Sequence, residues 1–264
     1  MRKTLALLLL AAVGCEIENT LLFDRSQTDR YTFPDNRVPE HLLREATLTT
    51  DDGAQIALAW AQQAEPTTTI LLLHGRGGNI DEIWDRVMTL WDRGFAVVVI
   101  DYRGFGRSSG EPSEAGLYED GRTTVAWLEQ EGVQRETLVV WGISLGTAVA
   151  SQLGVELPVY AVVLDAPFTR MRDMVEEATP IGLPGDWVIE SEWDTLGRID
   201  GLLSPLVVAH GTDDNIVPLR LGRIVFEAAP EPKAFVPVED AGHNNLILDH
   251  ADPILAALEA VTQP

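Results

Sequence analysis

Cysteine is almost missing from this sequence of 264 residues, and its histidines are few and scattered. The single cysteine, Cys15, excludes an intrachain disulfide and a zinc site built from cysteines. The five histidines, at positions 41, 74, 210, 243 and 250, show no spacing typical of metal ligands. We therefore expect chemistry that needs neither a metal nor another cofactor.

Positive charge is also scarce. The chain has 19 Lys and Arg against 41 Asp and Glu, which gives a formal net charge of −22. A field of that sign repels phosphate backbones and anionic lipid surfaces, so nucleic acid is not an expected partner. With 22 glycines, 15 prolines and 45% hydrophobic residues, the composition excludes a disordered or collagen-like chain and is typical of a globular protein.

The apolar run at residues 5–13 is too short to span a bilayer as a helix, and it follows the basic residues Arg2 and Lys3. Residues 1–14 therefore predict an export signal. The motif Ala-Val-Gly-Cys that ends at Cys15 resembles a bacterial lipobox, in which the cysteine is lipidated and anchors the protein to a membrane of the cell envelope. The same small residues also fit an ordinary export signal, which would give a periplasmic or secreted protein.

The rest of the chain divides into an irregular segment and one domain. Residues 15–44 are polar and without a clear period, which indicates a tether or an irregular lead-in. Two strand-like stretches, 46–50 and 55–61, flank an Asp-Asp-Gly-Ala turn and predict a hairpin at the start of the domain 45–264.

Six apolar runs rich in β-branched residues then alternate with helical patterns. They lie at 70–73, 96–100, 138–141, 161–164, 206–209 and 234–238. Continuous apolar strands separated by helices predict a mostly parallel sheet covered by helices on both faces, and therefore an α/β fold.

A candidate nucleophile follows the third of these runs. Gly142-Ile143-Ser144-Leu145-Gly146 comes directly after the expected strand 138–141 and precedes a helical stretch of small residues. The strand-turn-helix context is what a G-x-S-x-G nucleophile elbow requires, because the sharp turn exposes the serine hydroxyl and leaves no room for side chains two positions before and after it. The alternative is a glycine-rich turn with an idle serine.

A serine hydroxyl needs a base to remove its proton and an acid to orient that base. Of the histidines after Ser144, His210 ends a strand, where packing or hydrogen bonding is the usual role, and His250 begins the final helical stretch. His243 lies in a loop after the last expected strand and is therefore the candidate base. The loop 210–218 offers two adjacent candidate acids, Asp213 and Asp214.

From about residue 45 to 261 the chain resembles the α/β-hydrolase superfamily, and within it the compact branch related to ABHD-type serine esterases and depalmitoylases. The matching motifs occur in order: His74-Gly75, the run from Asp101 to Gly110, the stretch from Pro112 to Tyr118, the elbow, His210-Gly211-x-x-Asp214-x-x-Val217-Pro218 and Gly242-His243. The resemblance implies an α/β-hydrolase fold without a large lid. It also implies a structural role for the run at 101–110.

The same resemblance selects Asp214 as the catalytic acid, with Asp165 at the end of an earlier strand as a rival. Two backbone amides are needed to bind the developing oxyanion. The residue after the nucleophile, Leu145, supplies one, and the resemblance suggests Arg76 for the other, with Gly77 as the alternative. We expect His74 to anchor that loop.

These residues predict a serine hydrolase that cleaves carboxylic esters or thioesters of small molecules or lipids through an acyl-enzyme. The alternatives are a peptidase or amidase of the same superfamily and a non-catalytic envelope binding module. Trp187 and Trp193, in the connection of about forty residues between 165 and 206, are candidates to line an acyl pocket or to pack on the sheet. The sequence leaves the oligomeric state open.

Overall fold

The computed structural model describes residues 22–65, 68–178 and 191–263. The expected signal segment with Cys15, and Trp187, lie outside the described residues.

The described residues form an eight-stranded sheet in the order β10-β9-β8-β7-β4-β6-β3-β2. All neighbours pair in parallel except β2 with β3 and β3 with β6, which are antiparallel. The strands are β2 (Leu43–Thr49), β3 (Gln55–Ala61), β4 (Thr69–Leu73), β6 (Ala96–Ile100), β7 (Leu138–Ile143), β8 (Ala161–Asp165), β9 (Leu206–Gly211) and β10 (Lys233–Val238). The predicted mostly parallel sheet is therefore confirmed.

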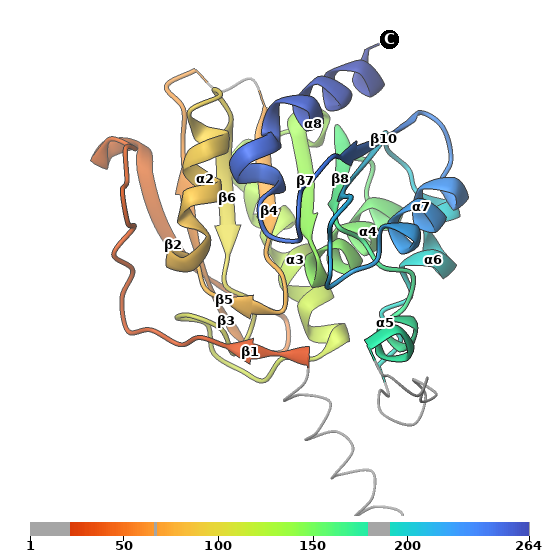
Figure 1. Cartoon of the computed structure of the whole chain (residues 1–264). Helices are drawn as coiled ribbons and strands as arrows, with labels where there is room; N and C mark the ends of the chain where they lie inside the picture. Colours follow the sequence, from red (N-terminus) through yellow and green to blue (C-terminus); the bar gives the residue numbers. More distant parts are fainter. Residues whose placement is uncertain (1–21, 66–67, 179–190, 264) are drawn as a thin grey trace, which may run out of the picture.

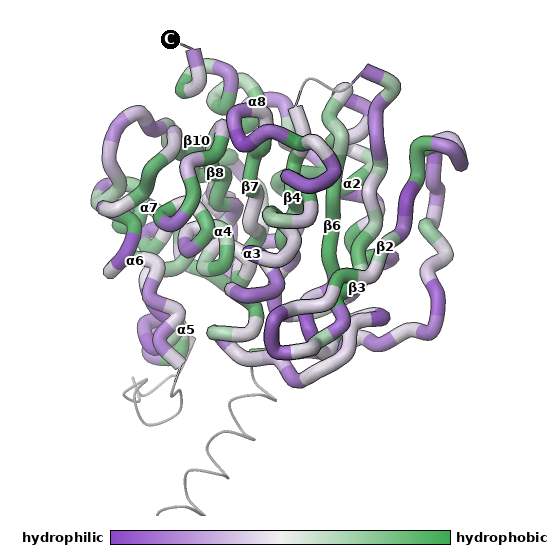
Figure 2. Tube along the Cα trace, turned by 180° about the vertical axis from the view of Figure 1, so that it is seen from behind, coloured by the Kyte–Doolittle hydropathy of each residue, from purple (hydrophilic) through white to green (hydrophobic). Residues whose placement is uncertain are grey.

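Successive strand residues point to opposite faces of the sheet, and both faces are covered. In β4, Leu71 and Leu73 enter one hydrophobic cluster, whereas Ile70 and Leu72 enter the other. The first cluster is closed by α3 (Glu114–Gln130), α4 (Leu145–Glu156) and α7 (Leu219–Ala228), and the second by α2 (Trp84–Trp91) and α8 (Leu246–Thr262). Figure 1 shows α2 and α8 in front of the sheet and α4 behind it, and Figure 2 shows the apolar central strands from the other side.

Short elements fill the connections. They are η1 (Glu40–Leu42), η2 (Asp81–Ile83), η3 (Arg135–Thr137), α5 (Met171–Ala178), α6 (Thr195–Arg198) and η5 (Ile199–Gly201). None of the helices in the described part of the chain is long and apolar enough to cross a membrane.

The segment from residue 22 to the start of the main sheet packs on the domain. Leu22 and Phe23 are each only 6% exposed and belong to the core. The strand β1 (Asp24–Arg25) then pairs with β5 (Gly77–Gly78) in a second, two-stranded sheet near the carboxyl ends of the parallel strands (Figure 1). Of the predicted tether or irregular lead-in, the described residues after 21 form an irregular segment that packs on the domain. The sequence gives no periodic signal here because the contacts come mainly from backbone groups and single side chains.

Candidate functional site

The candidate nucleophile sits in a strained turn. Ser144 lies between the end of β7 and the first residue of α4, with φ 52° and ψ −116°. A residue with a side chain rarely adopts this conformation, and it persists only where the surroundings impose it. Here the Ser144 N–H donates to the carbonyl of Asp165 (2.9 Å), and its own carbonyl accepts from the N–H and hydroxyl of Thr147 (2.9 and 2.6 Å).

The two flanking glycines permit this turn. A Cβ on Gly142 would lie 2.2 Å from the carbonyl oxygen of Gly146, and one on Gly146 would lie 2.2 Å from that of Leu73. Either contact is far inside van der Waals distance, so α4 would have to move away from the sheet. The elbow predicted from the G-x-S-x-G pattern therefore has the backbone that the pattern requires.

His243 and Asp214 meet from two loops that follow β10 and β9. Nδ1 of His243 lies 2.7 Å from Oδ2 of Asp214, while Oδ1 of Asp214 accepts from the N–H groups of Ile216 (2.9 Å) and Val217 (2.8 Å). An ionised carboxylate only accepts hydrogen bonds, so Nδ1 of His243 carries the proton and Nε2 is the basic nitrogen.

The surroundings keep Asp214 ionised. Burial acts to raise the pKa of this carboxyl, but the hydrogen bond from His243 and its electrostatic attraction, together with the two backbone N–H groups, lower it below its ordinary value. The neighbouring Asp213 is exposed. Of the two adjacent aspartates, the structure therefore brings Asp214, the one that the resemblance selects, to the histidine.

His210 supports the acid loop and takes the packing role predicted for it. It is fully buried, its Nε2 donates to the carbonyl of Val217 (2.9 Å), and that nitrogen lies 3.5 Å from Oδ2 of Asp214. Burial lowers the pKa of His210, so the ring is neutral. A Cβ on Gly222 of α7 would lie only 2.2 Å from its Nδ1, which explains the glycine there.

The glycine-rich loop after β4 lies directly against the elbow. A Cβ on Gly75 would be 3.4 Å from Cβ of Ser144 and 4.0 Å from its hydroxyl oxygen. His74 is fully buried, its ring centroid lies 4.5 Å from that of Tyr102 with the rings tilted by 51°, and Nδ1 donates to the carbonyl of Gly75 (2.8 Å). Burial lowers the pKa of His74 to about 4, which leaves a neutral ring that anchors the loop, as expected.

Ser144 and His243 line one cavity of about 390 Å³. The same cavity is bordered by the glycine-rich loop, by the apolar residues Ile83, Ile143 and Ile216, and by the charged residues Asp24, Arg76, Glu82 and Arg86. It therefore combines a hydroxyl, an imidazole, apolar surface and charges of both signs.

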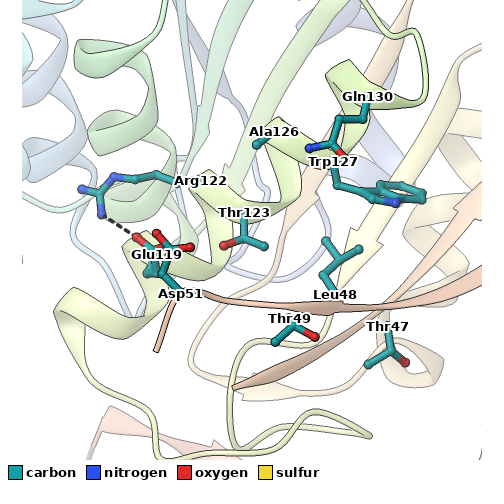
Figure 3. Close-up of a pocket in the computed structure, with 10 residues that line it drawn as sticks. All are labelled: Thr47, Leu48, Thr49, Asp51, Glu119, Arg122, Thr123, Ala126, Trp127 and Gln130. Carbon is teal, nitrogen blue, oxygen red and sulfur yellow. Dashed lines mark hydrogen bonds and ion pairs between the residues drawn. The ribbon is translucent and has the colours of Figure 1, made fainter. Parts of the chain in front are cut away.

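A larger cavity of about 630 Å³ lies elsewhere, between β2 and α3 (Figure 3). Its charged lining includes Arg122, which is paired with Glu119 and Glu156. Among the residues that the structure describes, no histidine, serine or cysteine lines it. The smaller cavity is therefore the candidate active site.

Asp165 is the rival acid, and it lies close to the site without contacting Nδ1 of His243. Its side chain is buried at the end of β8, and Oδ1 has no hydrogen-bond partner within the described residues. Burial raises the pKa of Asp165 to about 7. Geometry and ionisation thus both favour Asp214 as the partner of His243.

Trp193 packs in the core and does not border the cavity. It is fully buried, with ring centroids 5.7 Å from Tyr118 and 6.2 Å from Phe23. Of the two roles left open for this tryptophan, packing on the domain is the one observed.

For three of the charged residues that line the cavity, the sequence gives no sign that they belong to the site. Asp24 comes from the lead-in, Glu82 from η2, and Arg86 from α2. Arg86 donates to the carbonyl of Asn244 (2.9 Å), and so ties α2 to the loop that carries His243. Within the described residues, no group of three or more His, Cys, Asp or Glu side chains is placed to hold a metal ion.

Known proteins with similar sequences include uncharacterized proteins and a lipase. An uncharacterized protein of Mycobacterium tuberculosis is 32% identical over 205 residues, which cover 76% of this chain and 73% of that protein. The lysophosphatidylserine lipase ABHD12 of Danio rerio is 32% identical over 185 residues, covering 62% of this chain and 48% of the lipase.

Solved structures agree on the fold. An alpha-beta hydrolase from Vibrio vulnificus has a TM-score of 0.75 at 20% identity, covering 93% of this chain and 92% of that one. An esterase from Pyrococcus furiosus has a TM-score of 0.71 at 18% identity, covering 92% of this chain and 99% of that one.

The family model described as "Alpha/beta hydrolase family" matches residues 70–204, which include the elbow. The chain therefore belongs to the alpha/beta hydrolase family.

Proposed function

We propose that this protein is a serine hydrolase that cleaves carboxylic ester or thioester bonds, with Ser144 as nucleophile, His243 as general base and Asp214 as the acid that orients it. The observation that carries the proposal is the 2.7 Å contact between His243 and Asp214 beside a cavity that Ser144 also lines. Membership of a hydrolase family supports the reaction class.

In the proposed reaction, Nε2 of His243 accepts the proton of Ser144 as the oxygen attacks the ester carbonyl carbon. The ester C–O bond then breaks, and the imidazolium gives its proton to the departing alcohol. The acyl group remains on the serine. Water then attacks the acyl carbon as His243 accepts its proton. The bond between the acyl carbon and the Ser144 oxygen breaks, His243 returns the proton to that oxygen, and the acid is released. Asp214 stays ionised throughout and stabilises the imidazolium that forms in each half-reaction.

Two amides would bind the oxyanion of the tetrahedral intermediates. Leu145 is the first residue of α4, where the N–H groups have no partner within the helix. Arg76 lies in the glycine-rich loop whose neighbour Gly75 approaches Ser144. We propose the N–H groups of these two residues as the donors to the oxyanion.

The substrate class rests on the cavity and on one relative. Apolar residues beside charges of both signs suit an acyl ester with a polar or charged portion. The relative named as a lysophosphatidylserine lipase is consistent with such a substrate. We propose esters or thioesters ahead of peptides because a similar protein is named as a lipase. We propose a catalytic role ahead of a binding module because Ser144, His243 and Asp214 are all present and His243 contacts Asp214.

The test is hydrolysis of p-nitrophenyl esters from acetate to palmitate by residues 16–264, with a p-nitroanilide and an acyl thioester in parallel. We expect ester turnover with a maximum at one chain length, which would measure the space available to the acyl group. Turnover of the anilide alone would favour an amidase, and no turnover together with no labelling of Ser144 by a fluorophosphonate would overturn the proposal.

Replacing Asp165 by Asn tests the rival acid and gives a pH signature. The pKa of Asp165 is about 7 in the folded protein, above its value of about 3.9 in an unfolded chain. Between these values the folded state holds a proton that the unfolded state has lost, so this group makes stability fall as pH rises from about 4 to 7.

Asp165→Asn removes that loss. The free energy of unfolding of the variant minus that of the wild type should therefore be larger at pH 8 than at pH 5. The increase should be a few kcal/mol, since each pKa unit corresponds to about 1.4 kcal/mol. Urea unfolding at the two pH values measures this difference. We expect kcat to stay within about threefold of the wild type; a loss of about 10⁴-fold would assign the catalytic acid to Asp165 instead.

We also propose export and lipidation at Cys15, supported by the basic residues, the apolar run and the lipobox-like motif. In a bacterial host, radiolabelled palmitate should enter the wild-type protein and be absent from Cys15→Ser, which should appear in the soluble envelope fraction. Equal labelling of both proteins, or no labelling of either, would contradict lipidation at this residue.

A further inference from the structure

The glycine-rich loop that flanks Ser144 has a partner outside the main sheet. Strand β1 pairs in parallel with β5, with Asp24 opposite Gly77 and Arg25 opposite Gly78. The N–H of Asp24 donates to the carbonyl of Arg76 (2.9 Å). A loop with glycines at 75, 77 and 78 has many accessible conformations, so this hydrogen bond and pairing restrict the residue proposed to bind the oxyanion.

Residues 22–28, which we call the strap, are themselves firmly held. The ring of buried Phe23 lies edge-on to Phe105 and Trp193, with both centroid distances 6.2 Å. On the other side of β1, the carbonyl of Ser26 accepts from the N–H of Gly106 (2.9 Å). The strap is thus fixed to the core before β1 and to the β6–α3 connection after it.

The far end of the glycine-rich loop is tied to the same segment. The side-chain amide of Asn79 donates to the backbone carbonyl of Ser26 (3.3 Å). Asp101, at the end of β6, accepts from the N–H of Ile80 (2.8 Å) and from the hydroxyl of Tyr31, which follows the strap. Both ends of the loop from 75 to 80 are therefore held by residues of the lead-in.

No space separates the strap from the loop. A Cβ on Gly77 would lie 3.3 Å from Cβ of Asp24, tighter than ordinary contact, and 3.6 Å from the carbonyl oxygen and from Oδ2 of the same residue. Asp24 also borders the cavity that Ser144 and His243 line. A shift of the strap would thus be transmitted directly to the loop.

We propose that the strap is a positioning element of the active site, which holds the loop carrying Arg76 at the distance from Ser144 that oxyanion binding needs. The proposal rests on the proposed function, because it assigns the strap a role in the same reaction. Asp24 acts through its backbone N–H and through its contact with Gly77, so it is a positioning residue.

The test is a double-mutant cycle on the full chain with the preferred p-nitrophenyl ester. Gly77→Ala places a methyl group against Cβ of Asp24 and displaces the loop by a few tenths of an ångström, so kcat should fall about tenfold with little change in KM. Asp24→Gly alone should lower kcat about threefold, because glycine loosens β1. In the double variant the opposing Cβ is gone, so kcat should rise above that of Gly77→Ala and match that of Asp24→Gly.

Rescue by Asp24→Gly distinguishes the strap from a simpler effect. If the added methyl group merely blocked the substrate, the double variant would be no better than Gly77→Ala and KM would rise, which would overturn the proposal. Gly201→Ala, at a position with nothing within 4 Å of its added Cβ, is the matched control and should leave kcat unchanged. Urea midpoints confirm that all variants are folded.

The outcome separates this inference from the proposed function. If the wild type turns over esters and Ser144→Ala does not, but the cycle shows independent effects, only the strap proposal fails. If fluorophosphonate does not label Ser144 in the wild type, the proposed function fails, and the strap proposal fails with it.

Discussion

Ser144→Ala is expected to lower kcat for a p-nitrophenyl ester by at least about 10⁴-fold, because no acyl-enzyme can form without the serine oxygen. The residual rate would come from the oxyanion amides and from binding alone. Stability should change little, since alanine lacks only an oxygen at a half-buried position and must adopt the same φ of 52°. Initial-rate kinetics of the purified variant, beside urea unfolding, measure both quantities.

Ser151→Ala is the matched control for this substitution. Ser151 is fully buried in α4, the helix that begins directly after Ser144. Its hydroxyl donates to the carbonyl of Ala148 (2.9 Å), away from the cavity. Its loss should leave kcat within about twofold and cost about 1 kcal/mol of stability. Turnover that survives Ser144→Ala would remove this serine from the mechanism.

Asp214→Asn is expected to lower kcat by about 10³- to 10⁴-fold while KM changes little. An amide next to Nδ1 of His243 no longer requires the proton to reside there, so the imidazole loses its preference for the tautomer with a basic Nε2. It also loses the negative charge that stabilises the imidazolium. The hydrogen bonds from Ile216 and Val217 to Oδ1 can persist with the asparagine oxygen, so the loop should keep its conformation.

Asp213→Asn separates this effect from a general change in loop charge. Asp213 precedes Asp214, is exposed, and contributes its backbone N–H to the carbonyl of Ala241. We expect its kcat to equal that of the wild type across pH 6–9. A comparable loss in both variants would mean that the charge of the loop matters rather than the contact with His243.

The sheet could be predicted because its signal is local. Runs such as residues 96–100 are apolar on both faces, and the observed strand β6 has the same bounds. Alternate residues enter different clusters, which is why the predicted coverage of both faces was correct. Ser144 was also accessible from sequence, since the close approaches at Gly142 and Gly146 leave no alternative to glycine.

The remaining site features depend on contacts between distant segments. Periodicity could not distinguish Asp213 from Asp214, because only the path of the β9–α7 loop turns one of them toward His243. The sequence of the strap indicates only a tether or an irregular lead-in, because its pairing with the loop is made by backbone groups and leaves no periodic pattern. The sequence does not indicate whether Trp193 faces a pocket or the core. In the structure it packs against Phe23, which belongs to the strap.

The central claim is that Ser144 is the nucleophile, and covalent labelling tests it most directly. The wild type would be treated with a fluorophosphonate, digested, and analysed by mass spectrometry. We predict one adduct, on Ser144, and none in Ser144→Ala. An adduct on another residue, or labelling that persists in Ser144→Ala, would contradict the account.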